Sequence, residues 1–545
     1  MTLLPVGLGA IALFLGGYFL YARRIARAFS LDPGRPTPAH AQSDGCDFVA
    51  APRSVMFAQH FSAISAAGPI AGPILAGIAY GWLPGLLWIV LGCVFVGAAH
   101  DFATLVASVR HRGLSVGEIL RERIGRRAMA LYLSFIWIAL VYVIVAFTDL
   151  TAGAFVKPGT GGAVASSSAM YLGLALALGF SFRRFGIGLL PATAIALPLL
   201  VGVLVLGREF PLELPAWLDS GSPHLSWCAI VLAYCFAASL LPMPVLMQPR
   251  GYLGGFLLYG FLAIGVVGLL GGGVPVEYPA FLSWSDARSG QPLFPFLFVT
   301  IACGACSGFH GLVCSGTTSR QLDRETDAPA VGYGAMLLEG LIAVIALACV
   351  MMLAPGDERL KAGPDGIFAA GVARFAGVLG VPADLGLAFG LLALTTFIYD
   401  TLDVCTRLGR YILQELLGLG PGRGRVFATV LTLAPALAFL ALTDPGAFRK
   451  VWTAFGTSNQ LLAGLTLLGV AVWMRSEGRR HAFVALPAVL LLGITGWSLA
   501  WSAADIAESP LLGSVSAVLL LLAAALSFDC VLAWRRAGAA APAAA

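Results

Sequence analysis

Long apolar runs separated by short polar segments recur along the whole chain. A helix that crosses a bilayer needs roughly 20 predominantly apolar residues, and about fifteen runs reach or approach that length. The pattern therefore predicts an all-α, polytopic bundle of transmembrane helices. The predicted spans are Leu3–Ala22, Ser62–Tyr80, Leu83–Val109, Met129–Thr148, Ala169–Phe182, Ile187–Leu206, Leu225–Met247, Tyr252–Leu270, Phe294–Thr318, Val331–Leu353, Val381–Tyr399, Val426–Leu442, Val451–Met474, Ala482–Trp501 and Leu511–Trp534.

The polar segments between the runs are too short to form a soluble domain. The longest, Arg23–Phe61 and Pro355–Val381, have the size of loops. Only 11% of the residues are charged, whereas a soluble domain has about 25%. The run Leu3–Ala22 is followed by two arginines, which favours a retained first helix over a signal peptide. We expect an N-terminal helix with a basic loop at 1–61, a core of membrane helices at 62–400, and further transmembrane helices at 401–545.

The basic residues predict the orientation of the chain. With the N-terminus placed outside, 25 of the 33 Lys and Arg residues fall in inner loops and 8 in outer loops. This bias is typical of a correct topology, and it places the C-terminus on the inner, cytoplasmic side of the membrane. The net charge of +5 is spread over many short loops, which argues against a nucleic-acid partner.

Two predicted spans contain paired prolines that would interrupt a helix. Gly68–Pro73 carries Pro69 and Pro73 around Gly72, and the span Leu225–Met247 carries Pro242 and Pro244. A proline removes a backbone donor and clashes with the preceding turn. These are the second and seventh spans, so a repeat of five helices would relate them in opposite orientations. Matching interrupted helices in two inverted halves indicate a transporter binding site, although ordinary proline kinks would give the same pattern. We therefore expect 62–400, which includes both interrupted helices, to be the transporter core.

Ionisable residues inside spans are costly and therefore candidates for function. Asp101 lies in the third span, Glu339 in the tenth, and His310 in a glycine- and hydroxyl-rich stretch of the ninth. Histidine can relay protons near neutral pH. The alternative for each acid is a structural hydrogen bond between helices. Asp400 and Asp403 are expected to pair with Arg407 and Arg410 near the inner surface instead of contacting solute.

Several absences narrow the class of protein. Cys303-x-x-Cys306 has no second ligand pair, which disfavours a metal or redox site. No phosphate-binding loop and no HExxH or GxSxG motif is present. The sequence predicts a non-enzyme, without catalytic residues, cofactor or metal.

Several segments, taken together, resemble the carbon starvation A (CstA) family of bacterial inner-membrane transporters. They occur in the family's order and are Gly68–Pro73, Gly97–Phe102 with Ser108–Arg110, Leu241–Gly251, Phe294–Thr318, Val331–Gly334 with Met336 and Glu339, Thr401–Asp403 with Thr406–Leu408, and Phe455–Leu461. Two positions depart from the family pattern. Gly251 follows Pro249-Arg250 where the family has an acid, and Cys306 stands where a larger apolar residue is expected.

The resemblance implies a five-plus-five inverted repeat like that of the amino acid–polyamine–cation superfamily. It also implies uptake of peptides or pyruvate during carbon starvation, with pyruvate uptake coupled to protons. Na⁺ is the alternative coupling ion. The solute would bind between the two interruptions, and the ninth span would lie beside the first interruption. The residues expected to bind solute are Gly68, Pro69, Gly72, Pro73, Pro242, Pro244, Ser307, Gly308 and His310. Those expected to couple an ion are Asp101, His310, Glu339, Ser315 and Thr317.

Two other functions agree with the same sequence. A nutrient sensor that signals through its inner loops would bind solute without accumulating it. A passive channel is less favoured, because broken helices and buried acids suit alternating access better. The sequence leaves the choice between peptide and pyruvate, and the oligomeric state, open.

Overall fold

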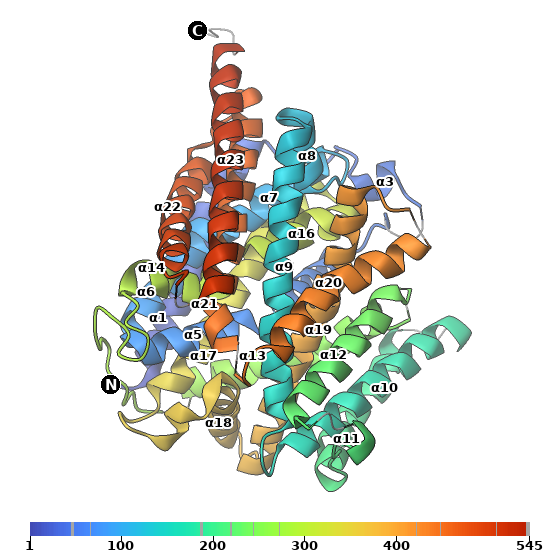
Figure 1. Ribbon diagram of the computed structural model, residues 1–545, viewed down its shortest axis with the longest axis vertical. Helices are drawn as coiled ribbons and strands as arrows, with labels where there is room; N and C mark the ends of the chain where they lie inside the picture. The colour runs from blue at the N-terminus through green and yellow to red at the C-terminus, as the bar shows by residue number, and fades with distance from the viewer. Residues whose placement is uncertain are drawn as a thin grey trace. The chain divides into compact units, whose positions relative to one another are not determined.

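A computed structural model describes residues 1–44, 48–65, 67–185, 189–218, 221–242, 245–271, 273–420, 422–446, 448–507 and 509–540 (Figure 1). Most of these residues are helical, and their only β contacts are the isolated bridges Ala51–Leu322 and Ser285–Pro292. Twelve of their helices are long and apolar enough to cross a membrane, or thirteen when a bent pair counts as one span. The predicted fold class is confirmed, whereas the number of about fifteen spans is not.

The helices form two compact units that each draw on separate parts of the chain. Unit 1 comprises Met1–Ile136, Val276–Met351 and Thr453–Ala545, and unit 2 comprises Trp137–Pro275 and Met352–Trp452. The helix α9 (Arg126–Phe155) runs from the first unit into the second, and α21 (Phe448–Ser476) begins in unit 2 and continues through unit 1.

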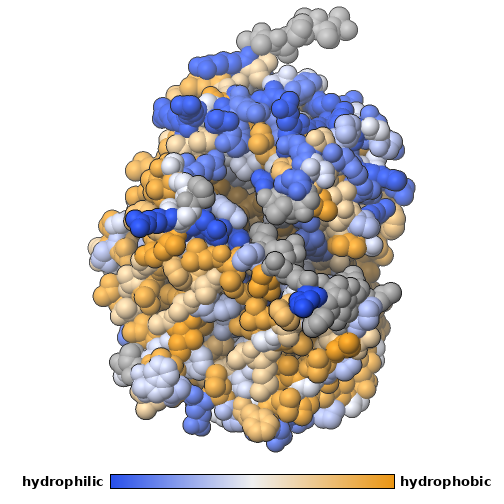
Figure 2. Space-filling view, turned by 90° about the vertical axis from the view of Figure 1, so that its right-hand side faces the viewer, coloured by the Kyte–Doolittle hydropathy of each residue, from blue (hydrophilic) through white to orange (hydrophobic). Residues whose placement is uncertain are grey.

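Unit 1 contains the helices that hold the candidate site. They are α1 (Leu3–Gly16), α2 (Arg23–Phe29), α3 (Pro38–Ala41), α4 (Arg53–Ile64), α5 (Gly68–Tyr80), α6 (Trp82–Gly92), α7 (Ala98–Arg110), α8 (Val116–Arg123), α14 (Leu293–Thr300), α15 (Ala302–Ala305), α16 (Gly308–Gly316), α17 (Ala335–Met351), α22 (Ala482–Ala504) and α23 (Pro510–Ala540). In Figure 1, α22 and α23 pack side by side. Figure 2 shows apolar side chains over much of one face, with hydrophilic side chains gathered toward the end at which α23 finishes.

Unit 2 contains the helices around the second predicted interruption. They are α10 (Gly161–Phe185), α11 (Leu189–Glu209), α12 (Pro223–Leu240), α13 (Met247–Gly271), α18 (Gly363–Gly377), α19 (Ala383–Leu417) and α20 (Arg423–Ala441). The helix α18 packs against α19 where the sequence predicted a loop. Its Asp365 and Arg374 lowered the apparent hydrophobicity of a segment that is largely buried.

The first predicted interruption is real, but its position was predicted wrongly. Gly68–Pro73 is helical and forms the first turns of α5, and the break lies just before it, after Ile64. The helices α4 and α5 meet at an angle of 46°. Pro69 sits in the first turn of α5, where a missing N–H costs nothing. The unwound backbone is therefore around Ser65, and not at the prolines.

The second predicted interruption connects two helices instead of breaking one. The helix α12 ends at Leu240 and α13 begins at Met247, and each contains an apolar stretch long enough to span a membrane. Pro242 is exposed in this connection, while Pro244 lies outside the described residues. The prediction that a single span, Leu225–Met247, is broken here is therefore wrong.

The ninth predicted span is the one that is broken most clearly. Phe294–Thr318 forms three short helices, α14, α15 and α16, with extended backbone at Cys306 and Ser307. Unwound backbone at membrane depth is tolerated only inside protein or beside a cavity, and both residues are buried. The glycine-rich sequence of this run thus separates two helix ends within unit 1.

Three segments of unit 1 are wound as π-helix: Gly17–Ala22 after α1, Cys93–Gly97 before α7, and Pro329–Gly334 before α17. The Tyr333 hydroxyl donates to the backbone oxygen of Val94 over 2.8 Å, which joins two of them. Such segments are frequent at functional sites. Here two of them directly precede the helices that carry Asp101 and Glu339.

Candidate functional site

Three buried ionisable residues from three helices of unit 1 meet at His310. Its Nδ1 lies 2.9 Å from Oδ2 of Asp101 on α7, and its Nε2 lies 3.1 Å from Oε2 of Glu339 on α17. All three side chains are at most 1% exposed. The residues that the sequence singled out for ion coupling at the third, ninth and tenth spans are thus brought into one cluster.

Asp101 is held from a second side by its neighbour in the sequence. His100 Nδ1 lies 2.7 Å from Asp101 Oδ1, so both carboxylate oxygens of Asp101 face a histidine. The Nε2 of His100 has no hydrogen-bond partner among the described residues. Since a ring nitrogen that faces a carboxylate must share a proton with it, Asp101 is well satisfied in its buried position.

Glu339 is less well satisfied than Asp101. The 3.1 Å contact with His310 is an ion-pair distance, yet neither oxygen of Glu339 receives a well-directed hydrogen bond from the described residues. An unsatisfied carboxyl group buried inside a membrane protein costs several kcal/mol, and such groups are typical of functional positions.

The first turn of α16, which carries His310, is fixed by Asn459 of α21. The Oδ1 of Asn459 accepts from the backbone N of Phe309 over 2.9 Å, and its Nδ2 donates to Ser307 and Cys303 over 3.0 and 3.2 Å. Side-chain oxygens commonly cap helix starts in this way. In the sequence, Asn459 stands out only as part of the family motif Phe455–Leu461, and its capping role could not be inferred because the contact joins distant segments.

The start of α5 packs against the same broken segment. A Cβ atom on Gly68 would lie 2.4 Å from Sγ of Cys303, and one on Gly72 would lie 2.4 Å from the backbone oxygen of Thr300. The two glycines are four residues apart, so they share one helix face, and small residues at this spacing let membrane helices approach closely. The expectation that the ninth span lies beside α5 agrees with this packing.

Other predicted residues lie at the edge of the cluster or away from it. Gly308 packs against the backbone of α21. The hydroxyl of Ser315 donates to the Gly311 oxygen and that of Thr317 to the Val313 oxygen, both one turn back in α16. Ser315 is buried and Thr317 exposed. These hydroxyls satisfy their own helix and do not contact Asp101 or Glu339.

Sequence reasoning missed His60, which lies in α4 within a segment assigned to a loop. It is 1% exposed, and its Nδ1 lies 2.8 Å from the hydroxyl of Thr318. Five residues further along the chain, at the break between α4 and α5, the buried hydroxyl of Ser65 has no partner among the described residues. The apolar residues around His60 were the available signal that this segment is buried.

In unit 2, Asp400 and Asp403 were assigned to the wrong partners. Both bind Arg250 at the start of α13: Asp400 Oδ1 lies 2.6 Å from Arg250 Nε, and Asp403 Oδ2 contacts Arg250 Nη1. Tyr234 also donates to Asp403 over 2.7 Å. Arg407 and Arg410 instead donate to the last carbonyl groups of α12. A buried guanidinium that satisfies two carboxylates made Arg250 the stronger partner.

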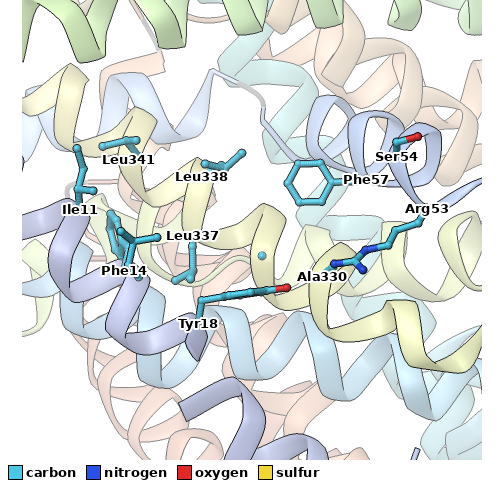
Figure 3. A pocket seen from close by; sticks show the side chains of 12 residues that line it. Ile11, Phe14, Tyr18, Arg53, Ser54, Phe57, Ala330, Leu337, Leu338 and Leu341 are labelled. Carbon is cyan, nitrogen blue, oxygen red and sulfur yellow. The ribbon is translucent and has the colours of Figure 1, made fainter. Parts of the chain in front are cut away.

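A cavity in unit 1 that lies away from this cluster is lined mainly by apolar side chains. It has a volume of about 760 Å³ and is lined mainly by side chains of α1, α4 and α17. Figure 3 shows Tyr18 and Arg53 reaching into it from opposite sides. Its walls of Phe14, Leu337 and similar residues suit an apolar group better than a carboxylate, so we place the chemistry at the His310 cluster.

Comparison with known proteins identifies the family. Residues 3–360 and 357–498 match the family described as Carbon starvation protein CstA. The chain belongs to the CstA family. It is 33% identical to the peptide transporter CstA of Helicobacter pylori strain J99, over 88% of this chain and 79% of that protein. The identity is 33% with peptide transporter CstA of Escherichia coli K12, over 90% and 80% of the two chains.

A further relative of this CstA family member carries a different name. The pyruvate/proton symporter BtsT of Escherichia coli K12 is 31% identical over 92% of this chain and 81% of that protein. Among solved structures, a manganese transporter from Eremococcus coleocola aligns with 91% of this chain and 99% of its own, at 15% identity and a TM-score of 0.48. The family and the membrane-length helices together identify a membrane transporter and not an enzyme.

Proposed function

We propose that this CstA family member is a secondary active transporter that takes up small carboxylate-bearing nutrients, peptides or pyruvate, under carbon starvation and coupled to protons. The observation that carries the proposal is His310, buried in a broken helix between Asp101 and Glu339. The names of the relatives, peptide transporter and pyruvate/proton symporter, support the class of solute.

Counting protons explains why this cluster suits coupling. Each ring nitrogen of His310 faces a carboxylate oxygen, and each contact is favourable only with a proton between the two atoms. A neutral histidine supplies one such proton, so the arrangement holds one more, on the ring or on a carboxyl. Loss of that proton would set a lone pair against a carboxylate within the buried site. The cluster would then have to rearrange, which links proton release to a change in helix packing.

We place the solute beside the starts of α5 and α16. Both helix starts lie in unit 1, and both are adjacent to Cys303, since Gly68 packs on its sulfur and the capping residue Asn459 donates to it. Helix N-termini carry partial positive charge and attract carboxylates. Ser65 and Ser307 supply hydroxyls at the two interruptions. Gly68, Gly72 and Gly308 act by permitting close helix packing.

We further propose that the chain lies in the bacterial inner membrane with its N-terminus outside and its C-terminus in the cytoplasm. The loop-by-loop excess of Arg and Lys on one side supports this orientation. A green fluorescent protein fused to the C-terminus should fluoresce, whereas alkaline phosphatase fused there should be inactive. Active phosphatase at the C-terminus would reverse the orientation.

The central test measures uptake into liposomes that contain only this protein. His310→Ala should abolish accumulation of labelled solute while insertion into the membrane stays normal. His40, an exposed histidine that pairs with Asp323, provides the matched control, and His40→Ala should transport like the wild type. Unchanged uptake by His310→Ala would remove the cluster from the mechanism.

A second variant separates coupling from solute binding. Glu339→Gln keeps the shape of the side chain but removes its charge and its ability to accept a proton. It should lose accumulation driven by a pH gradient while retaining exchange of labelled for unlabelled solute. Uptake that resists a protonophore but requires sodium would assign the coupling to Na⁺ instead.

The solute is decided by counterflow in the same liposomes. Labelled pyruvate and labelled dipeptides are each tested against an unlabelled excess inside. Exchange of one and not the other identifies the class. Binding of either without net accumulation would favour a nutrient sensor over a transporter.

A further inference from the structure

Three arginines of unit 2 converge on the C-terminal end of α12. Arg407 Nη2 donates to the backbone oxygens of Ala238 and Leu241 over 2.8 and 2.7 Å. Arg410 donates to the oxygen of Ser239 over 2.5 Å, and Arg425 to that of Leu240 over 2.9 Å. The last carbonyl groups of a helix lack intrahelical partners, so part of the role of these arginines is to cap α12.

Capping leaves most of their charge uncompensated. The C-terminus of a helix carries about half a negative charge, against three guanidinium groups. In the described ranges, no acidic residue lies within ion-pair distance of Arg407, Arg410 or Arg425. Asp400 and Asp403, which lie on the same helix as Arg407 and Arg410, bind Arg250 instead. About two and a half positive charges therefore remain at this position.

Two guanidinium N–H groups are also left without acceptors. Arg407 is 5% exposed and Arg410 is 1% exposed, and the Nε atom of each has no hydrogen-bond partner among the described residues. Buried donors of this kind are nearly always satisfied in folded proteins. The guanidinium groups of these two neighbouring arginines are therefore incompletely satisfied by the described residues.

Both arginines line a cavity of about 560 Å³, together with Arg425. The other lining residues are mostly apolar, and they are Leu240, Leu241, Pro242, Tyr411, Gln414 and Leu419. The guanidinium of Arg410 also stacks on the ring of Tyr411, 4.5 Å from its centroid. The cavity thus combines a cationic end with apolar walls.

We propose that this cavity binds a phosphate-bearing anion through Arg407, Arg410 and Arg425. The guanidinium fork matches the oxygens of a phosphate, and basic pockets between membrane helices bind anionic lipid headgroups. The apolar walls would accommodate the part of a lipid next to its phosphate. The same chemistry fits free inorganic phosphate, and the test separates the two sources.

The test uses the full-length protein purified in mild detergent. Native mass spectrometry measures retained phosphatidylglycerol after exchange into zwitterionic detergent, and isothermal titration measures binding of inorganic phosphate. Arg425, half-buried at the start of α20, can be changed with little risk to folding. Arg425→Gln should weaken binding about fivefold, as expected for one arginine near a membrane surface. Arg410→Gln should weaken it at least as much.

Arg24→Gln is the matched control, because Arg24 is exposed and lies outside the cavity. It should bind phosphatidylglycerol and phosphate like the wild type. Selective loss of the lipid in the cavity variants assigns a lipid headgroup, and selective loss of inorganic phosphate assigns the free ion. Equal retention of both ligands by the wild type, Arg425→Gln and Arg410→Gln would overturn the proposal.

Discussion

The ion-pair cluster at the start of α13 makes a sharp prediction about stability. Arg250 is 1% exposed and contacts the carboxylates of Asp400 and Asp403, which are 17% and 0% exposed. Arg250→Met keeps a long flexible side chain but leaves two buried carboxylates without their counter-charge. Removing one partner of a buried pair costs about 3–5 kcal/mol, and the upper half of that range is expected here because two carboxylates lose the same partner.

A second arginine variant shows whether the loss of stability in Arg250→Met is specific to the buried ion pairs. Arg208 forms an exposed ion pair with Asp384, and such surface pairs contribute about 0–1 kcal/mol. Arg208→Met should therefore lower the free energy of unfolding by no more than that. Equilibrium unfolding in mixed micelles of mild detergent and dodecyl sulfate measures both variants under the same conditions.

A double-mutant cycle then tests the pairing itself. Asp403→Asn in the Arg250→Met background should restore at least about 1 kcal/mol, because it removes one of the two uncompensated charges. Strictly additive losses would refute the assignment of Asp403 to Arg250. So would an Arg250→Met variant that unfolds at the same dodecyl sulfate fraction as Arg208→Met.

Two further substitutions test packing and a second ion-pair network, both by the same unfolding assay. Gly72→Ala would place a methyl group 2.4 Å from the backbone oxygen of Thr300 and should cost about 1–3 kcal/mol, whereas Gly9→Ala, with open space around it, should be neutral. Glu325→Gln removes the counter-charge of two arginines around a fully buried carboxylate and should cost about 3 kcal/mol. Glu358→Gln, in an exposed pair, should change stability by less than about 0.5 kcal/mol.

The sequence was sufficient for the fold class and for most helix positions, because apolar length reports directly on membrane helices. The predicted span Leu83–Val109 became Trp82–Arg110, and Ala482–Trp501 became Ala482–Ala504. The helix α18 was missed because its length and its charged residues do not meet that criterion, although its packing against α19 buries much of it.

The candidate site was predicted as a set of residues but not as an arrangement. The cost of burying charge singled out Asp101, His310 and Glu339 individually. Their meeting depends on contacts between residues as far as 209 positions apart, which spacing along one chain cannot specify. Asp403 and Arg407, four apart on one helix, appeared to be natural partners. Tertiary contacts overrode that local preference, because Arg250 pairs with Asp403 and Arg407 caps the last carbonyl groups of α12.

The π-helical stretch Cys93–Gly97 fixes which way the residues after it point. Successive residues turn by about 100° around a regular helix, and a wider turn holds one residue more than a regular one would. Shortening the stretch by one residue, so that it rewound as ordinary helix, would swing Asp101 about 100° away from His310. Asp101 would still be present in α7, but it would no longer contact His310. The proposed role of Asp101 in proton coupling thus depends partly on the number of residues in this stretch, which a single-codon deletion would change.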